Sequence, residues 1–242
     1  GSGVIITREV RVGPNKTEKI NFVWTAGHVI DNLRSVRTVI KDGQSKKIVE
    51  FKDAQIVKEL IENGRRVGEL KMDAKVLKYS DADDGEDLAL LMIRKREFIQ
   101  QNVEFHIAED PVAIGTELYH VGSLLGQQGS NSMTRGIISQ VGRIHGKVEF
   151  DQTTVTAFPG SSGGGVYLQD GRYVGMIVRG AGEGFNLMVP VRRMKRWAEK
   201  HDIMWALDPS LPSPSLDDIK KLPVESTKKK KGKKDEGGTE KS

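Results

Sequence analysis

Short runs of apolar and β-branched residues, separated by glycine, asparagine and aspartate, make up most of this 242-residue chain. Many short strands with frequent turns between them are typical of a β-sandwich or a β-barrel. The sequence therefore predicts an all-β fold from Gly3 to about Val189. The clearest runs are residues 36–40, 74–79, 88–93, 136–141 and 174–178.

One β-hairpin is marked by the pair Asn63-Gly64, which separates apolar runs at residues 56–61 and 66–70. Asn-Gly readily adopts the positive φ angles that a type I′ turn requires at both central positions. We expect this hairpin to form an exposed ribbon.

A single segment at the end of the β-rich region has helical spacing. Apolar side chains recur every three or four positions between residues 191 and 201, with arginine and lysine between them. This pattern predicts one amphipathic helix that closes the domain. The residues on its inner face are Val191, Met194, Trp197, Ala198 and His201.

The sequence changes character after this helix. Residues 202–227 include a proline-rich stretch at 208–214 that cannot continue a helix, so we interpret them as a linker that contributes no core. Residues 228–242 open with the lysine cluster Lys228 to Lys234 and hold no aromatic residue, which predicts a disordered tail. The tail has two interpretations: a solubilising segment, or a contact with nucleic acid or an anionic surface.

Composition excludes several classes of protein. The chain has no cysteine, which rules out disulfides, thiolate zinc sites and cysteine nucleophiles but leaves a hydroxyl nucleophile available. Residues 223–242 contribute +3 of the net charge of +5, so the rest lacks the basic surface of a dedicated nucleic-acid-binding domain. No apolar run approaches the roughly 20 residues of a transmembrane helix, and no secretory signal precedes the first strand. We therefore expect a soluble chain, with its compartment and oligomeric state open.

The strongest chemical signal is a serine within a glycine run, F-P-G-S-S-G-G-G-V-Y, at residues 158–167. Glycines let the backbone fold back tightly, so that N–H groups can converge on a developing oxyanion. Interpreted as G-x-S-G-G, the run makes Ser162 a nucleophile and the N–H groups of Gly160 and Ser162 an oxyanion hole. Taken alone, the same run also fits a flexible Gly/Ser loop.

A histidine and an aspartate at strand ends complete the constellation. His28 follows Ala26-Gly27 at the end of an apolar strand, a position that suits a general base. Asp87 begins the apolar run 88–93, where a desolvated carboxylate can accept a hydrogen bond from an imidazole and fix its tautomer. Each residue alone also fits a structural role. The joint order His, Asp, Ser along the chain is the chymotrypsin order, unlike that of subtilisin or the α/β-hydrolases.

These motifs resemble those of the trypsin-like peptidases, and within them the protease domain of the HtrA/Deg branch. The resemblance covers residues 1–201. The segment Pro159–Gly164 resembles the P-G-N-S-G-G motif of that family, with Ser161 where asparagine is usual. The other matching stretches are residues 1–6, 25–30, 87–91, 121–126, 135–139 and 182–189.

The resemblance implies a chymotrypsin-like fold of two six-stranded antiparallel β-barrels, followed by the C-terminal helix at 191–201. The first barrel would span about 1–108 and the second about 111–190, with the active site between them. His28 and Asp87 would then come from the first barrel and Ser162 from the second. A long insertion between His28 and Asp87 departs from the family pattern, and a linker and lysine tail stand where HtrA proteins carry a PDZ domain.

The implied activity is that of a serine endopeptidase, which cleaves a polypeptide substrate through an acyl-enzyme and needs no metal or organic cofactor. Two alternatives stay open. One is a catalytically silent peptide-binding pseudoprotease or chaperone-like module. The other is a nucleic-acid-binding protein that acts through Lys228 to Lys234.

The resemblance also implies a specificity pocket with Thr156 at its base and Val178, Gly180 and Gly184 in its walls. Threonine supplies no negative charge, so cleavage after lysine or arginine should be poor. Uncharged medium or large residues should be accepted, apolar ones first, with polar ones such as glutamine possible through the threonine hydroxyl. Arg179 would lie on the strand that pairs with substrate. It either favours an acidic residue at a neighbouring subsite or faces solvent.

Overall fold

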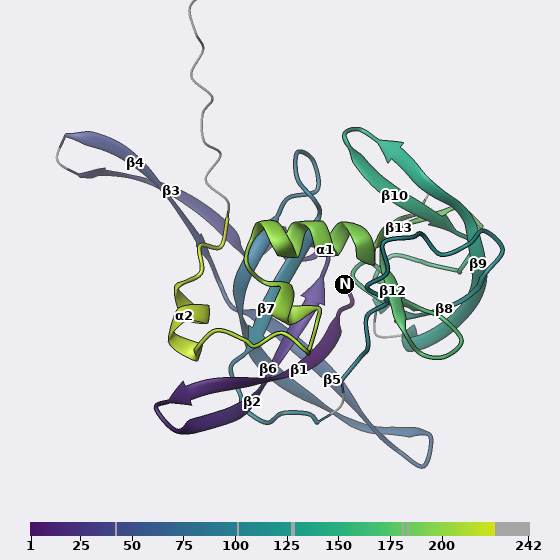
Figure 1. Cartoon of the computed structure of the whole chain (residues 1–242), viewed down its shortest axis with the longest axis horizontal. Helices are drawn as coiled ribbons and strands as arrows, with labels where there is room; N and C mark the ends of the chain where they lie inside the picture. Colours follow the sequence, from purple (N-terminus) through teal and green to yellow (C-terminus); the bar gives the residue numbers. More distant parts are fainter. Residues whose placement is uncertain (42, 101, 127–128, 181, 183, 226–242) are drawn as a thin grey trace, which may run out of the picture.

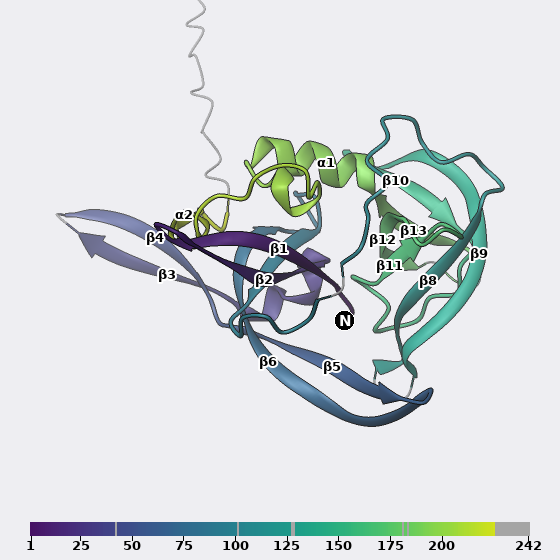
Figure 2. The same cartoon turned by 60° about the horizontal axis from the view of Figure 1, so that its bottom comes forward.

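Two β-rich halves lie side by side, and helix α1 (Val191–Lys200) follows the last strand of the second half (Figures 1 and 2). The computed structural model describes residues 1–41, 43–100, 102–126, 129–180, 182 and 184–225. The lysine cluster Lys228 to Lys234 lies outside the described residues. Within the described part of the chain, no helix is long and apolar enough to cross a bilayer.

The second half is a closed barrel of six antiparallel strands in the order β10-β13-β12-β11-β8-β9, as predicted. Burial alternates along β8, because successive side chains of a strand point to opposite faces. The inward side chains, among them Leu118, Ile138 and Val155, form a core of their own. The strands are β8 (Glu117–Leu124), β9 (Gly129–His145), β10 (Val148–Thr153), β11 (Gly165–Tyr167), β12 (Tyr173–Gly180) and β13 (Asn186–Pro190).

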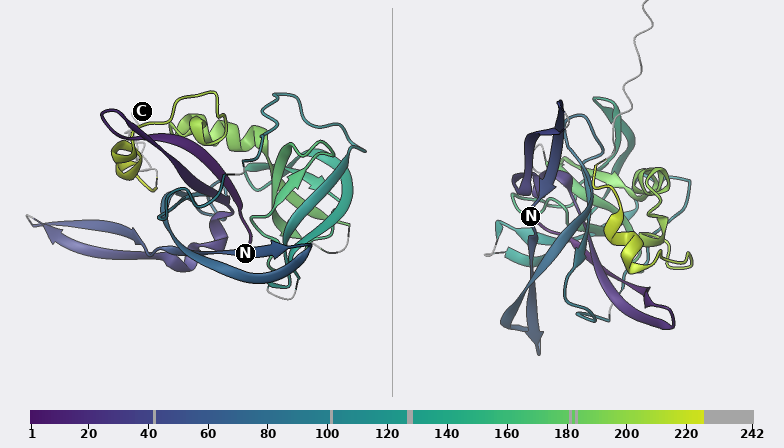
Figure 3. Two further views of the ribbon diagram at one scale, coloured as in Figure 1. Left: turned by 90° about the horizontal axis from the view of Figure 1, so that it is seen from below. Right: turned by 90° about the vertical axis from the view of Figure 1, so that its left-hand side faces the viewer.

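The first half is a five-stranded sheet in the order β1-β2-β7-β6-β5. The prediction of a six-stranded first barrel was therefore wrong in its strand count. Two further strands, β3 and β4, pair only with each other and project from the molecule (Figures 1 and 3), because their largely exposed side chains offer no face to pack on a core. The strands are β1 (Val4–Gly13), β2 (Lys16–Thr25), β3 (Arg34–Lys41), β4 (Gln44–Phe51), β5 (Ala54–Glu62), β6 (Arg65–Ser80) and β7 (Leu88–Ile93).

The predicted hairpin at Asn63-Gly64 joins β5 to β6, and both residues have positive φ angles, 50° and 75°. Its outer end is exposed, as expected, and it reaches the second half (Figure 2). There the Asn131 amide Nδ2 donates a hydrogen bond to Glu59 Oε2 at 2.7 Å. The insertion between His28 and Asp87 therefore links the two halves of the molecule.

The predicted helix is confirmed as α1, with Val191, Met194, Trp197 and Ala198 buried. The interpretation of residues 202–227 as a linker was wrong for the described part of that segment. It forms a short 3-10 turn at Met204–Ala206 and helix α2 (Leu216–Lys221), which pack on β1 and β2 (Figure 1). The proline-rich stretch breaks helical structure but brings buried apolar side chains to the sheet.

Aromatic stacking and hydrogen bonds fix this C-terminal segment on the first half. The rings of Phe22 and Trp205 pack edge to face with centroids 5.0 Å apart. The Trp24 indole donates to the Ala206 carbonyl at 3.1 Å, and Arg8 Nε donates to the Trp205 carbonyl at 2.7 Å. The segment is thus part of the core of the half that carries His28.

A chain that ends after Asp208 should lose stability. Leu216 and Ile219 are buried, and each buried aliphatic side chain contributes about 1.5–3 kcal/mol. The ammonium of buried Lys78 would also lose its hydrogen bond to the Pro223 carbonyl, 2.7 Å away. Thermal unfolding should show a lower Tm for this chain, whereas a chain that ends at Glu225 keeps all these contacts. Equal Tm values for both truncations would contradict the packing described here.

Candidate active site

His28 and Asp87 meet because the strands next to them pair. His28 lies in the 3-10 turn Gly27–Val29 directly after β2, and Asp87 immediately precedes β7. Strands β2 and β7 are antiparallel, with Thr25 opposite Ala89. The His28 Nδ1 atom lies 3.0 Å from both carboxylate oxygens of Asp87, whose Oδ1 also accepts the His28 backbone N–H at 2.9 Å.

The electrostatics of this pair favour a positive charge on the imidazole. The hydrogen bond that His28 donates to Asp87 raises the pKa of His28 above its usual value, more than burial lowers it. A carboxylate only accepts hydrogen bonds, so Nδ1 carries the proton and Nε2 is left as the basic nitrogen. The His28 side chain is 33% exposed whereas Asp87 is buried. A substrate can therefore contact the imidazole, while the Asp87 carboxylate is shielded from solvent.

The backbone that carries Asp87 is held from α1. The buried guanidinium of Arg193 donates to the Glu86 carbonyl at 2.6 Å and to the Glu86 carboxylate at 2.7 Å. Sequence reasoning placed this arginine only on a helix face. Its signal was its position at the edge of the apolar stripe of the helix, next to Trp197, because a charge that is buried there requires a partner.

Ser162 lies in the loop between β10 and β11 of the closed barrel, half-buried. Its Oγ lies 3.5 Å from the Val178 carbonyl on β12. Ser161 is buried, and its Oγ accepts the Phe158 N–H at 3.1 Å. Of the two serines in the run, Ser162 is therefore the one that a substrate can reach.

Two N–H groups of the glycine loop have no hydrogen-bond partner in the part of the chain that the structure describes. The Pro159 carbonyl accepts the Leu125 N–H at 2.9 Å. The C=O and N–H of one trans peptide point in opposite directions, so the Gly160 N–H points away from Leu125. Among the residues that the structure describes, the N–H groups of Gly160 and Ser162 donate to no backbone carbonyl or side chain. Gly160 has a φ of 102°, which only glycine adopts without strain. These are the two donors that the sequence predicted for an oxyanion hole.

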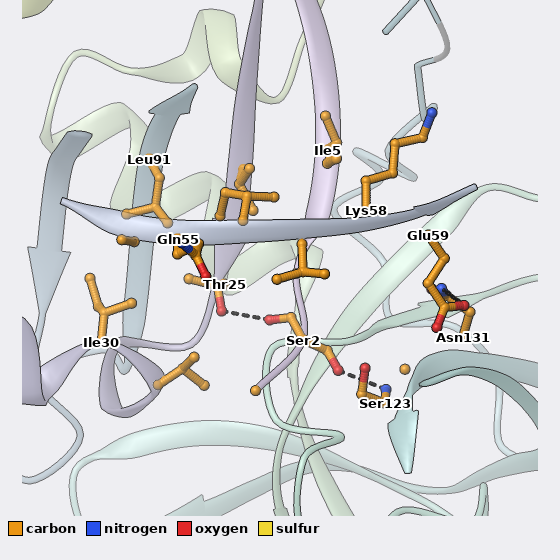
Figure 4. Close-up of a pocket in the computed structure, with 18 of the residues that line it drawn as sticks. Ser2, Ile5, Thr25, Ile30, Gln55, Lys58, Glu59, Leu91, Ser123 and Asn131 are labelled. Carbon is orange, nitrogen blue, oxygen red and sulfur yellow. Dashed lines mark hydrogen bonds between the residues drawn. The ribbon is translucent and has the colours of Figure 1, made fainter. Parts of the chain in front are cut away.

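Ser2 joins this loop to the histidine half through four hydrogen bonds. Its N–H donates to the Ser162 carbonyl at 2.7 Å, and its hydroxyl donates to the Gly160 carbonyl at 2.7 Å. The hydroxyl also accepts the Ser123 N–H at 2.8 Å, and the Ser2 carbonyl accepts Thr25 Oγ1 at 2.7 Å (Figure 4). Sequence reasoning missed this role, because Ser2 entered only as part of residues 1–6, one of the stretches that resemble the family.

Replacing Ser2 with alanine should lower kcat/KM by about 10- to 100-fold, because the Gly160 carbonyl and the Ser123 N–H lose their shared partner and the oxyanion donors shift. The rate of labelling by a fluorophosphonate should fall in parallel. Ser132→Ala provides the control, since among the described residues the Ser132 hydroxyl donates to the Gly129 carbonyl on β9 and to no other group. Equal kcat/KM values for the two variants would show that Ser2 does not position the loop.

His28 and Ser162 come from opposite halves, and among the described residues no hydrogen bond joins their side chains. Such contacts often tighten only when substrate binds. A cavity of about 560 Å³ lies beside Ser162. Of the predicted pocket residues, Thr156 and Gly180 line it, and Val178 and Gly184 are not among its lining residues. Arg179, predicted on the strand that pairs with substrate, also lines it.

Arg179 is anchored within the protein. Its Nη2 donates to the Ala82 carbonyl at 3.0 Å, and its guanidinium lies 5.7 Å from the ring centroid of Phe150. Within the described residues, no group of three or more His, Asp or Glu side chains could hold a metal ion.

Comparison with known proteins identifies the class. Residues 1–176 match the family of the trypsin-like peptidase domain, and the chain therefore belongs to the trypsin-like peptidases. The predicted family and enzyme class are confirmed.

Among solved structures, the crystal structure of the serine endoprotease from Yersinia pestis is similar, with a TM-score of 0.50 and 19% identity. The match covers 81% of this chain and 61% of that one, so this chain spans less than two thirds of that protein. It confirms the predicted chymotrypsin-like fold class. No curated protein matches the chain.

Proposed function

We propose that this chain hydrolyses peptide bonds through a triad of His28, Asp87 and Ser162. The observation that carries the proposal is the imidazole of His28, whose Nδ1 lies 3.0 Å from the Asp87 carboxylate and whose side chain is 33% exposed. The loop of Ser162 supports it with two unpaired N–H groups among the described residues.

In the proposed reaction, His28 Nε2 takes the Ser162 hydroxyl proton as Oγ attacks the substrate carbonyl carbon. The N–H groups of Gly160 and Ser162 stabilise the oxyanion, and the buried carboxylate of Asp87 stabilises the imidazolium. His28 then gives its proton to the leaving amine, which departs and leaves an acyl-enzyme. Water, deprotonated by His28, attacks the ester carbon and releases the acid product and the Ser162 hydroxyl.

The cavity beside Ser162 supports a preference for an uncharged side chain on the acyl side of the cut bond. Thr156 lines it, and no aspartate or glutamate does so among the described residues. A lysine or arginine side chain would enter without a counter-ion, which is costly in a desolvated pocket. We propose that Arg179, at the edge of this cavity, favours an acidic residue at a neighbouring subsite.

Covalent labelling tests the proposed activity. A fluorophosphonate should add to Ser162 in folded protein, as shown by intact mass and by peptide mapping, and it should not add to a Ser162→Ala variant. A folded wild-type chain that is not labelled would indicate the pseudoprotease alternative, in which the fold binds peptides without turnover.

A further inference from the structure

A buried asparagine lies in the wall of the cavity beside Ser162. Asn186 is the first residue of β13 and pairs with Thr153 on β10 and Gly180 on β12. Its side chain is 1% exposed and lines the same cavity as Thr156 and Ser162. Buried amides normally satisfy both of their ends, so each end of Asn186 requires a partner.

The orientation of the Asn186 amide is set by one hydrogen bond. Its Nδ2 donates to the Val155 carbonyl at 2.7 Å, and because a carbonyl only accepts, the nitrogen must face Val155. Oδ1 therefore faces the other way, toward Gly180, which lines the cavity. A methyl group on Gly180 would lie only 2.6 Å from Oδ1, so the glycine leaves room for it.

The Asn186 Oδ1 atom is buried and has no hydrogen-bond partner within the described part of the chain. A buried acceptor without a donor is costly, and a ligand that supplies the donor gains that energy on binding. A carboxylate side chain brings no donor. An ammonium or guanidinium brings donors, but the described lining holds the cation Arg179 and no carboxylate to balance the charge. Neutral donors remain.

We propose that Asn186 selects a carboxamide side chain, glutamine or asparagine, on the acyl side of the cut bond. This inference rests on the proposed function, since it assigns the specificity of the same site. A carboxamide offers an N–H to Asn186 Oδ1 and a carbonyl to the Thr156 hydroxyl, whereas a serine or threonine side chain is too short to fill a cavity of about 560 Å³.

The test compares three peptides that differ only in the residue on the acyl side of the cut bond, which is Gln in the first, Met in the second and Lys in the third. Methionine matches glutamine in length but offers no amide. Wild type should cleave the Gln peptide with about tenfold higher kcat/KM than the Met peptide, the gain expected of one hydrogen bond in a desolvated pocket. Asn186→Leu should abolish this ratio while Ser162 still reacts with the fluorophosphonate. Ser132→Ala, which changes a hydroxyl outside the lining of this cavity, is the control and should keep the ratio.

A second variant covers the outcome in which Asn186→Leu does not fold. Asn186→Asp keeps the size of the side chain but loses the hydrogen bond to the Val155 carbonyl, and it places a carboxylate at the cavity wall. The Lys-to-Gln ratio of kcat/KM should rise at least tenfold, a gain that misfolding cannot produce. A wild-type preference for Met over Gln, or a ratio that Asn186→Leu leaves intact, would overturn the inference.

Binding of the same peptides to Ser162→Ala, measured by calorimetry, separates this inference from the proposed function. Tighter binding of Gln than Met supports the role of Asn186 even in a chain that does not turn over. Equal binding overturns it, even where wild type is labelled at Ser162.

Discussion

Replacing Ser162 with alanine should abolish peptide hydrolysis while leaving the fold intact. The change removes one half-buried hydroxyl that makes a long hydrogen bond of 3.5 Å to the Val178 carbonyl, so it costs little stability. It also removes the nucleophile, and loss of the serine of such a triad lowers kcat by about 10⁶-fold. A fluorogenic peptide assay and a thermal melt of the same preparation measure both effects.

Ser161→Ala is the matched control, because it makes the same chemical change one residue earlier. Ser161 is buried and its Oγ accepts the Phe158 N–H, so this variant should lose stability and retain far more activity. If Ser161→Ala abolishes hydrolysis and Ser162→Ala does not, the assignment of the nucleophile is wrong by one residue.

Replacing Asp87 with asparagine should lower turnover by about 10³- to 10⁴-fold, with little change in substrate binding. Asp87 has a φ of 53°, and asparagine tolerates this left-handed conformation as aspartate does, so the backbone should not shift. The amide, however, can donate to Nδ1 and thereby favour the tautomer in which Nε2 carries the proton. The kcat and KM of the two chains separate these effects.

The pH dependence gives an independent readout of Asp87. Its carboxylate raises the pKa of His28, and only neutral His28 can act as a base. In wild type, kcat/KM should therefore fall as the pH falls through this raised pKa. In Asp87→Asn the residual activity should persist to lower pH, because the imidazole has lost the partner that favours its charge.

Two carboxylates of the same loop serve as controls for Asp87. The backbone N–H groups of Asp83 and Asp84 donate to Asp81 Oδ1, so their role is in the turn. Asp83→Asn and Asp84→Asn should leave turnover almost unchanged. A loss at either position as large as that of Asp87→Asn would move the third role of the triad there.

Local signals in the sequence predicted the elements and the histidine half of the site. The Asn63-Gly64 turn and the helix at 191–200 follow from residue preferences over a few positions. His28 and Asp87 could be linked because each stands at the end of an apolar run, and the two runs pair in the sheet.

Features that depend on contacts between distant segments could not be predicted. Phe22 packs on Trp205, more than 180 residues later, and nothing near either residue indicates its partner. The strand count of the first half could not be predicted for the same reason. The sequence of β3 favours a strand, but it does not indicate whether that strand joins the sheet. The four bonds of Ser2 and the unpaired Oδ1 of Asn186 also arise only in the folded chain.

The packing of Trp205 and Ile219 on the first half sets an order of events during synthesis. The ribosome makes β1 and β2 first, but the residues that cover their apolar face are among the last of the described chain to be made. Contacts so distant in sequence form slowly, because a long loop must close before they stabilise anything. The half that carries His28 and Asp87 can therefore complete its core only after Ser162 and the whole closed barrel have been translated. At that point, the nascent chain on the ribosome contains all three residues of the proposed triad but not the complete fold that positions them.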